Sequence, residues 1–348
     1  MLASLTQQLA DEGHLSDTQV LLAVDELVKE SVSAEAKADF LIALAAKGET
    51  PEELAAFARE LRSRSVPVPI ADAWRASREV LDVCGTGGDR LNTFNISTSV
   101  ALVAAAAGVA VAKHGNRAVT SQSGSADVLE ALGVPVDLSP DDAARSLREH
   151  GFAFFFAPRY HPAFKHIAPA RKLCAERGQR TLFNILGPLL NPARPSAQLL
   201  GVPRPELCEP IARVLQSVGV RRAMVVSGRA GPGGASLDEL STLGENTIAE
   251  FHHERGFSVS VLPPSSFPVQ PATLANLVGG DKQANAEIIR RILAGAERGP
   301  RRDAVLLNSA AALFVAGRAR SMNEGWEIAA GALDSGKAGA KLEELRRH

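Results

Sequence analysis

The sequence predicts an α/β fold: a small N-terminal helical domain, then a larger α/β domain with a mostly parallel sheet covered by helices. Two observations predict it. Residues 1–70 carry successive helix signals and end in a proline-rich stretch. From residue 79 onward, short apolar runs alternate with helical patterns, which is typical of parallel strands joined by helices. The 348 residues leave room for two unequal domains, which we place at 1–70 and 71–348.

The helical domain is predicted from its start and stop signals. Ser16 and Gln19 form a capping box, and residues 34–47 are rich in alanine and leucine. Pro51, followed by two glutamates, marks another helix start. The prolines within 65–70 cannot continue a helix, so this stretch is expected to be a linker.

Strands and helices alternate through the second domain. The predicted strands are 79–84, 109–112, 152–156 and 223–227. The predicted helices are 97–107, 125–132, one that starts at 140, 206–218, and a helical tail from 281 that ends with 334–347. The segment 160–191 breaks this pattern because it is basic and only partly helical. We expect part of it to pack against the N-terminal helices.

Charge and hydropathy exclude several classes of protein. The formal net charge of −1 gives no broad basic field, which argues against nucleic acid as a partner. The longest nearly uncharged stretch, 94–112, contains polar residues and predicts a buried helix and strand, so no membrane span is expected. The start of the sequence lacks a signal-peptide pattern, so we expect a cytoplasmic protein.

The three cysteines, Cys84, Cys174 and Cys208, are widely spaced. They form no Cys-x-x-Cys pair, so they predict neither a zinc site nor a disulfide framework. Cys84 adjoins a glycine-rich loop and is either a reactive thiol or a small apolar residue that ends a buried strand.

Two polar, glycine-rich loops carry the strongest functional signal. The first spans 82–89 and leads to Asn-Ile-Ser-Thr at 95–98, and the second spans 113–125. Glycines let backbone N–H groups turn toward a ligand, and a helix N-terminus adds partial positive charge, so each loop can hold an anion. Two such loops so close in the chain predict a ligand with phosphates at both ends.

These loops leave several roles open. The first lacks the lysine of a Walker A loop and the G-x-G-x-x-G spacing, which disfavours a nucleotide triphosphatase or a dinucleotide enzyme. Lys113 supplies a point charge in the second loop. His114 is either a general base or a positioning group, and Arg117 either contacts substrate or pairs with Asp127.

Acidic and basic residues farther along the chain suggest ligands for a metal and for a carboxylate. Magnesium prefers carboxylates together with phosphate oxygens, so adjacent Asp238 and Glu239 form a candidate metal site; acids at a helix start are the alternative. Arg171 can bind a substrate carboxylate through two hydrogen bonds, with Arg180 and Lys165 as competitors.

Seven short motifs occur in a fixed order. They are Gly-Thr-Gly-Gly-Asp at 85–89, Asn-Ile-Ser-Thr at 95–98, Lys-His-Gly-Asn-Arg at 113–117, Ser-Gly-Ser-Ala-Asp at 123–127, Arg-Thr-Leu-Phe-Asn at 180–184, Gly-Pro-Leu-Leu-Asn-Pro at 187–192 and Leu-Asp-Glu at 237–239. By these motifs and their order along the chain, the sequence closely resembles the anthranilate phosphoribosyltransferases of tryptophan biosynthesis. The resemblance covers nearly the whole chain. It implies Mg²⁺-dependent transfer of the phosphoribosyl group of 5-phosphoribosyl 1-pyrophosphate to anthranilate, an active site at the hinge between two domains, and a homodimer.

The resemblance also implies roles for individual residues. Those implied to hold the phosphoribosyl donor are Gly85, Gly88, Asp89, Thr93, Asn95, Ser97, Thr98, Lys113, Ser121 and Ser125. Those implied to hold anthranilate or to line its path are Gly85, His114, Asn116, His161, Arg171 and Gly187. The implied magnesium ligands are Ser97, Asp238 and Glu239. Of these residues, Lys113, Asn116 and Arg171 are expected to contribute most directly to catalysis.

Some features depart from this family, and two other classes compete with it. Thr120 and Gln122 stand where the family usually has a serine and a basic residue, so one charge near the donor phosphates is missing. A pyrimidine nucleoside phosphorylase shares the fold type and a similar Lys-His-Gly-Asn segment but normally has a longer chain. A non-catalytic relative that binds nucleic acid through a basic groove is the second competitor, and the near-neutral charge argues against it.

Overall fold

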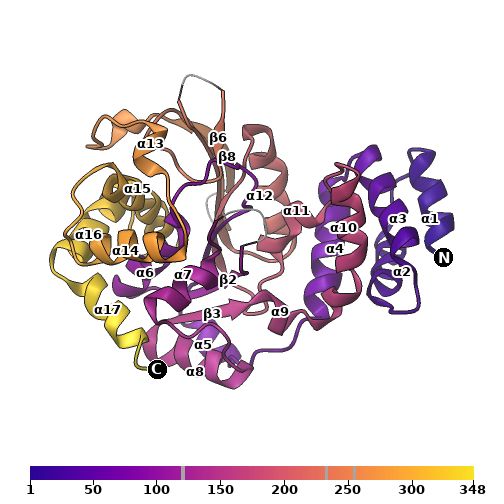
Figure 1. The fold of residues 1–348 in the computed structure, drawn as a ribbon, viewed down its shortest axis with the longest axis horizontal. Coiled ribbons are helices and arrows are strands. Elements are labelled where there is room, and N and C mark those ends of the chain that lie inside the picture. The colour runs from indigo at the N-terminus through magenta and orange to yellow at the C-terminus, as the bar shows by residue number, and fades with distance from the viewer. Residues whose placement is uncertain (119–121, 232–233, 254–255) are drawn as a thin grey trace.

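A small helical domain and a larger α/β domain make up the fold, as predicted (Figure 1). The computed structural model describes residues 1–118, 122–231, 234–253 and 256–348. The N-terminal helices are α1 (Leu2–Ala10), α2 (Asp17–Val28), α3 (Ala34–Lys47) and α4 (Pro51–Ser63). Both predicted capping signals are present, because Ser16 with Gln19 and Thr50 with Glu53 form capping boxes. The boundary between the domains at residue 70 stays a prediction.

One mixed sheet forms the centre of the α/β domain, with the strand order β3-β2-β1-β4-β5-β7-β8 in the described residues. The strands are β1 (Val80–Gly85), β2 (Ala110–Gly115), β3 (Phe152–Phe156), β4 (Ala197–Gly201), β5 (Arg222–Arg229), β6 (Ser236–Leu237), β7 (Asn246–His252) and β8 (Gly256–Leu262). The first five strands pair in parallel, while β6, β7 and β8 are antiparallel additions beyond β5. The carboxyl ends of β1 and β2 therefore lie side by side, which brings the two glycine-rich loops together.

Helices cover both faces of the sheet. Beyond the N-terminal domain they are α5 (Asp72–Ala76), α6 (Ile96–Ala106), α7 (Ser125–Leu132), α8 (Pro140–His150), α9 (Ala157–Tyr160), α10 (Ala168–Glu176), α11 (Phe183–Leu186), α12 (Cys208–Ser217), α13 (Leu274–Leu277), α14 (Lys282–Leu293), α15 (Pro300–Val315), α16 (Met322–Asp334) and α17 (Lys337–Leu345). Short 3₁₀ turns are η1 (Pro162–His166), η2 (Gly187–Leu189), η3 (Pro205–Leu207) and η4 (Pro264–Ser266). The predicted final helix 334–347 is wrong as a single helix. It breaks at Gly336, whose φ of +76° is the left-handed conformation that ends helices.

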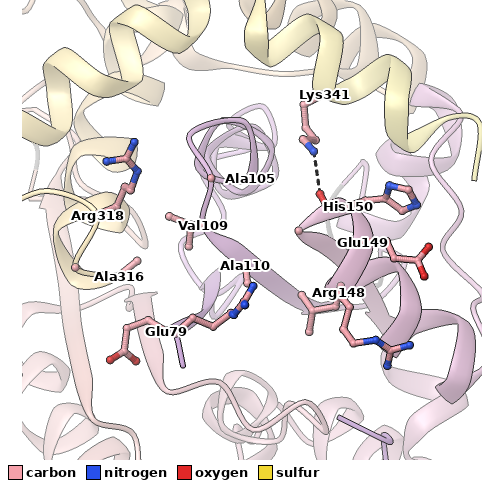
Figure 2. A pocket seen from close by; sticks show the side chains of 15 residues that line it. Glu79, Ala105, Val109, Ala110, Arg148, Glu149, His150, Ala316, Arg318 and Lys341 are labelled. Carbon is pink, nitrogen blue, oxygen red and sulfur yellow. Dashed lines mark hydrogen bonds between the residues drawn. The ribbon is translucent and has the colours of Figure 1, made fainter. Parts of the chain in front are cut away.

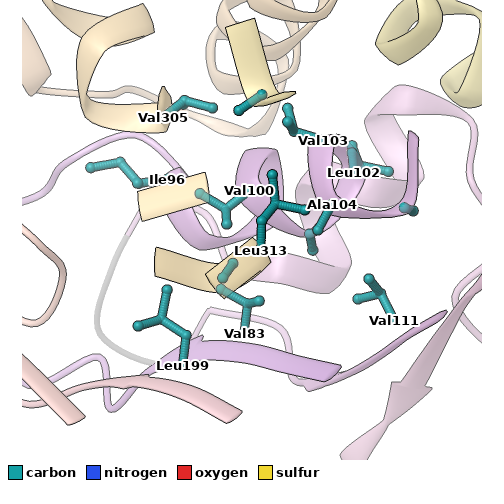
Figure 3. Packing of buried hydrophobic residues seen from close by; sticks show 14 of the residues in the cluster. Val83, Ile96, Val100, Leu102, Val103, Ala104, Val111, Leu199, Val305 and Leu313 are labelled. Atoms are coloured by element: carbon teal, nitrogen blue, oxygen red, sulfur yellow. The ribbon is translucent and has the colours of Figure 1, made fainter. Parts of the chain in front are cut away.

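One face of the sheet packs on α6 and α15. Val83 of β1, Val111 of β2 and Leu199 of β4 belong to the apolar cluster that includes Val100 of α6 and Leu313 of α15 (Figure 3). Helix α6 is apolar nearly all round and is buried between the sheet and other helices. This burial explains the uncharged stretch 94–112. In the described part of the chain, no helix combines the length and the apolar character needed to cross a bilayer.

The opposite face of the sheet shares its core with the N-terminal helices. A second apolar cluster contains Leu41 of α3, Phe57 of α4, Leu215 of α12 and Val225 of β5. Helix α10 packs against α3, as expected for part of the segment 160–191. Cys84 also lies in this cluster, and burial raises its pKa well above the usual value. The thiol is therefore a buried apolar group rather than a reactive nucleophile.

Candidate active site

A cavity of about 600 Å³ opens where β1 and β2 end. Its wall is made by the first glycine loop, the N-terminus of α6, the second loop and the acidic pair that follows β6. The predicted site residues that line it are Gly85, Asp89, Thr93, Asn95, Ser97, Thr98, Lys113, His114, Asn116, Ser125, Asp238 and Glu239. The fold thus places twelve of the predicted residues around one cavity. Ser121, together with the neighbouring Thr120, lies outside the described residues.

Lys113 of β2 lines the cavity and is 2% exposed. Its Nζ donates to the Val83 carbonyl at 2.7 Å and to the Ser97 hydroxyl at 3.4 Å. Burial lowers the pKa of this ammonium. The contacts hold the positive charge beside Ser97 at the start of α6.

Asp238 and Glu239 connect the first glycine-rich loop to the start of α6. The Asp238 carboxylate accepts hydrogen bonds from the amides of Gly87 and Gly88 and from the Thr86 hydroxyl at 3.2 Å. Glu239 Oε1 accepts from the Ser97 amide at 3.1 Å. The pair follows a strand instead of starting a helix, so the helix-start alternative is wrong. Glu239 instead caps α6, a helix far away in the sequence.

The acidic pair is buried without a cationic partner close enough to form an ion pair in the described residues. Burial, with Asp89 nearby, raises the pKa of Asp238 to about 7. Burial and Asp238 together raise the pKa of Glu239 to about 8. Two carboxylates that resist ionisation and face a cavity form a donor set that suits a divalent cation. The described residues contain no group of three or more metal-ligating side chains, so such a cation would need further oxygens from substrate or water.

Three positioning residues were missed from the sequence. Gly201 ends β4 beside Gly85, and a Cβ there would lie 1.6 Å from the Asp238 carbonyl oxygen. Asn308 of α15 exchanges two hydrogen bonds of 2.8 Å with the backbone of Leu240. Asn285 of α14 donates to Asn95 at 2.9 Å. Gly201 follows an apolar pair, but the strand that it ends was not predicted, and nothing in the sequence linked these three residues to the acidic pair or to the loops.

A row of rings leads away from the cavity. The rings of His114 and His161 are 5.3 Å apart, and those of His161 and Phe164 are 5.1 Å apart. Phe164 meets Phe183 at 5.8 Å, and the Arg171 guanidinium lies 5.3 Å from the Phe183 ring centre. Gly187 contacts His114 through its backbone. Gly88, His161 and Gly187 therefore adjoin residues of the cavity wall without lining the cavity itself, and Arg171 lies at the far end of the row of rings.

The two histidines are neutral, and each has one ring nitrogen without a hydrogen-bond partner in the described structure. The Nε2 atoms of His114 and His161 are both buried without a hydrogen-bond partner in the described structure. Burial lowers the pKa of His114 to about 3 and that of His161 to about 4. A neutral, buried histidine beside a second histidine is poorly suited to gain a proton, so we assign His114 to positioning rather than general-base catalysis.

We expect these histidines to make the folded protein sensitive to mild acid. Unfolded imidazoles take up protons below a pKa of about 6.5, whereas the buried ones do not, so the free energy of unfolding falls as the pH falls from about 6.5 toward 4. Each histidine should contribute about 2 kcal/mol to the loss at pH 5. Urea unfolding at pH 7 and pH 5 measures it. The variant His161→Phe should lose less stability than the parent, while exposed His253→Phe should match the parent; equal pH dependence in all three would contradict the assignment.

Arg117 and Asp127 organise the second loop. Arg117 pairs with Asp127 at 3.2 Å and with Glu130 at 2.6 Å. Asp127 also accepts from the amides of Ala118 and Gly124. The predicted pairing of Arg117 with Asp127 is therefore confirmed, and Arg117 also lines the cavity, so both of its predicted roles stay open. Gln122 is exposed and does not line the cavity.

A second cavity of about 380 Å³ lies at the other edge of the sheet, where β1 and β2 begin (Figure 2). Lys341 donates to the His150 carbonyl at 2.9 Å, and Arg318 donates to the Ala107 carbonyl at 2.9 Å. These carbonyls end α8 and α6, so the cations offset the negative ends of two helices. None of the predicted site residues lines this cavity.

Comparison with known proteins decides the family. The family model described as "Glycosyl transferase family, a/b domain" matches residues 77–339. The model described as "Glycosyl transferase family, helical bundle domain" matches residues 3–65. The anthranilate phosphoribosyltransferase of Geobacter sulfurreducens is 45% identical over 354 residues, covering 99% of this chain and 98% of its own. That of Symbiobacterium thermophilum is 45% identical over 344 residues, covering 99% and 96%. The chain belongs to the anthranilate phosphoribosyltransferase family.

Solved structures of this family agree in fold. The crystal structure of the anthranilate phosphoribosyltransferase from Thermus thermophilus has a TM-score of 0.88 and 41% identity, covering 99% of this chain and 98% of its own. The enzyme from Saccharomyces cerevisiae, in complex with PRPP and Mg, has a TM-score of 0.86 and 29% identity, covering 99% and 97%. The anthranilate phosphoribosyltransferase fold therefore extends over the whole chain, including the helical domain.

Proposed function

We propose that this protein transfers the phosphoribosyl group of 5-phosphoribosyl 1-pyrophosphate to the amine of anthranilate. The products are N-(5-phosphoribosyl)anthranilate and pyrophosphate. One observation carries the proposal: a cavity lined by two glycine-rich loops, a buried lysine and an acidic pair adjoins a row of rings that ends at an arginine. The cavity suits a charged sugar donor, and the ring row suits a flat aromatic acid.

The donor would occupy the cavity between the two loops. Gly85, Gly88 and Asp89 belong to the first loop, and Ser97 and Thr98 belong to the start of α6. Thr93, Asn95, Lys113, Ser121 and Ser125 complete the proposed donor set. The N–H groups and the Lys113 ammonium would stabilise the negative charge that develops on the departing pyrophosphate. Loss of one such contact typically costs about 3 kcal/mol of transition-state stabilisation.

The acceptor needs orientation more than deprotonation. The amine of anthranilate is attached to an aromatic ring and is unprotonated near neutral pH, so no strong base is required. Asn116 and Arg171 would hold the acceptor, while Gly85, His114, His161 and Gly187 would line its path. Rings that exclude water also protect the donor from hydrolysis.

A magnesium ion would be held by Ser97, Asp238 and Glu239. The buried carboxylates fit this role because burial raises the pKa of both, and a bound cation would favour their ionised form. When bound, Mg²⁺ supplies charge neutralisation for pyrophosphate oxygens. Homodimer formation and a cytoplasmic location remain predictions, and sedimentation analysis of the purified protein tests the dimer.

The activity has a direct test. Purified protein should consume anthranilate fluorescence only when both Mg²⁺ and 5-phosphoribosyl 1-pyrophosphate are present. The assay should be run with several aminobenzoates, so that anthranilate is distinguished from related aromatic amines as the acceptor. No loss of fluorescence with any of them, over a range of pH and divalent metals, would reject the proposed function.

Arg171→Ala should raise the KM for anthranilate at least about tenfold and leave the KM for the donor within about twofold, because Arg171 is proposed to bind only the acceptor carboxylate. Steady-state kinetics with each substrate varied in turn measures both constants. Lys172→Ala is the matched control, since Lys172 is the next residue of α10 and its side chain is 79% exposed. Equal changes in both KM values would show that Arg171 is misassigned.

A further inference from the structure

Lys37 of α3 is a buried charge that the reaction does not use. Its side chain lies in the helical domain and is 1% exposed. Within the described residues it forms no ion pair with a carboxylate. Burying an ammonium without a counter-ion costs free energy, so the hydrogen bonds of the Lys37 ammonium must offset this cost.

Both hydrogen bonds of Lys37 go to backbone carbonyls that end helical turns. Nζ donates to the Lys29 carbonyl at 2.6 Å and to the His166 carbonyl at 2.8 Å. Lys29 caps the C-terminus of α2, and His166 ends η1. A positive charge is favourable at such ends, because the last carbonyls of a helix lack intrahelical partners. Lys37 thus ties together α2, α3 and η1.

The carbonyl held by Lys37 directly precedes the helix that carries Arg171. Ile167 follows His166 and is fully buried, and the Arg171 amide donates to the Ile167 carbonyl at 3.1 Å. The next residues of α3 also contact α10: the Ala38 carbonyl accepts from Cys174 Sγ at 3.8 Å, and Asp39 pairs with Arg177 at 3.0 Å. Of these contacts, the one from Lys37 lies nearest to the start of α10.

We infer that Lys37 is a positioning residue for acceptor binding: it fixes the start of α10 and thereby the direction of the Arg171 side chain. The inference rests on the proposed function, in which Arg171 binds anthranilate. A methionine would fill the same space at a lower desolvation cost but could not bind the two carbonyls. The ammonium therefore provides a defined position for two chain segments rather than packing alone. Small displacements of a binding group are enough to weaken a substrate complex.

The test compares Lys37→Met with Asp39→Asn, which breaks the exposed ion pair on the same helix–helix contact. Lys37→Met should raise the KM for anthranilate about tenfold and leave the donor KM within about twofold. Asp39→Asn should change neither. If Lys37→Met leaves the anthranilate KM unchanged, or raises both KM values equally, the inference is wrong.

Hydrogen exchange provides a readout that does not depend on the substrate. Amides of 167–176 should exchange at least about tenfold faster in Lys37→Met than in the parent, while amides of α15 should not change. Unchanged exchange in 167–176 overturns the inference even if Arg171→Ala behaves as proposed. If exchange is faster in Lys37→Met but Arg171→Ala leaves the anthranilate KM unchanged, the proposed acceptor site at Arg171 is rejected. The conclusion that Lys37 positions the start of α10 would then still hold.

A second variant covers the case in which Lys37→Met does not fold. Lys37→Ala leaves a space that n-propylammonium fills with its short carbon chain and its ammonium group. Adding n-propylammonium should restore protection of 167–176 and lower the anthranilate KM toward the parent value. Failure to restore either, or an equal effect on Asp39→Asn, would overturn the inference.

Discussion

Glu239→Gln is expected to lower Mg²⁺-dependent turnover by about 100-fold or more and, at the same time, to stabilise the metal-free protein at pH 8. Turnover falls because the substitution removes one negative charge from the proposed metal site. Stability rises because folding raises the pKa of the Glu239 carboxyl to about 8, so ionising this group costs free energy in the folded protein but not in the unfolded chain. Glutamine does not ionise and avoids this cost. The Gln oxygen can still accept from the Ser97 amide, as the carboxylate does at 3.1 Å.

The sign of the stability effect follows from proton binding. Between pH 4.5 and 8 the folded parent retains a proton that the unfolded chain has lost, so its free energy of unfolding falls as the pH rises. The Gln variant cannot ionise and so lacks this loss of stability, and its free energy of unfolding at pH 8 should exceed that of the parent by on the order of a few kcal/mol. Thermal unfolding at pH 5 and pH 8, with EDTA or with Mg²⁺, measures it. Added Mg²⁺ should stabilise the parent and not the variant.

Glu245→Gln is the control, because Glu245 is exposed in the same connection after the acidic pair. It should retain turnover and show the parent's pH dependence. If Glu239→Gln keeps both turnover and the response to Mg²⁺, the acidic pair is not a metal site, and its burial has another cause.

Gly201→Ala should be the most damaging single-methyl addition near the site. The new Cβ would lie 1.6 Å from the Asp238 carbonyl oxygen and 2.2 Å from its carbonyl carbon, so the backbone that carries the acidic pair must move. Overpacking of this kind usually costs about 1–3 kcal/mol of stability. Turnover should fall about 100-fold, because a displacement of this backbone moves Asp238 and Glu239, two of the three proposed metal ligands. Urea unfolding and steady-state kinetics with Mg²⁺ varied measure the two effects.

Gly331→Ala is the matched control for this methyl addition. Gly331 lies within α16, and a Cβ there would meet nothing within 4 Å. Alanine favours a helix over glycine, so this variant should be as stable as the parent or slightly more stable, with full activity. A Gly201→Ala protein that is as active as Gly331→Ala would mean that Asp238 need not lie where the structure places it.

Local sequence signals were sufficient for much of the fold. The helices at 34–47 and 125–132 and the strand at 152–156 have the predicted bounds, because caps and apolar patterns define them locally. The strands β4, β7 and β8 were not predicted. β4 contains Gln198, whose buried side chain donates to the Pro188 carbonyl at 2.8 Å, so its apolar pattern is interrupted by a polar residue whose partner lies outside the strand. β8 alternates serine with apolar residues, which was a usable strand signal.

The candidate site, like the fold, could be predicted from the sequence only in part. Its two loops are continuous stretches of sequence, so glycines and helix starts revealed them without a structure. Gly201 and Asn308 act on the acidic pair and the residue after it through contacts that only the folded chain creates. Arg171 was chosen for its side-chain chemistry. What distinguishes it from Arg180 and Lys165 in the structure is the contact of its guanidinium with the Phe183 ring.

The apolar cluster that joins α3 and α4 to α12 and β5 has a consequence for dissecting the molecule. A fragment that starts after residue 70 would expose Leu215 and neighbouring side chains of α12 to water, and the excised N-terminal helices would lose the surface they pack on. The N-terminal helices therefore share their hydrophobic interior with the α/β domain, whereas the cluster on the other face of the sheet lies within the α/β domain alone. The two domains are therefore units of architecture, and each is expected to lose stability when the chain is divided between them.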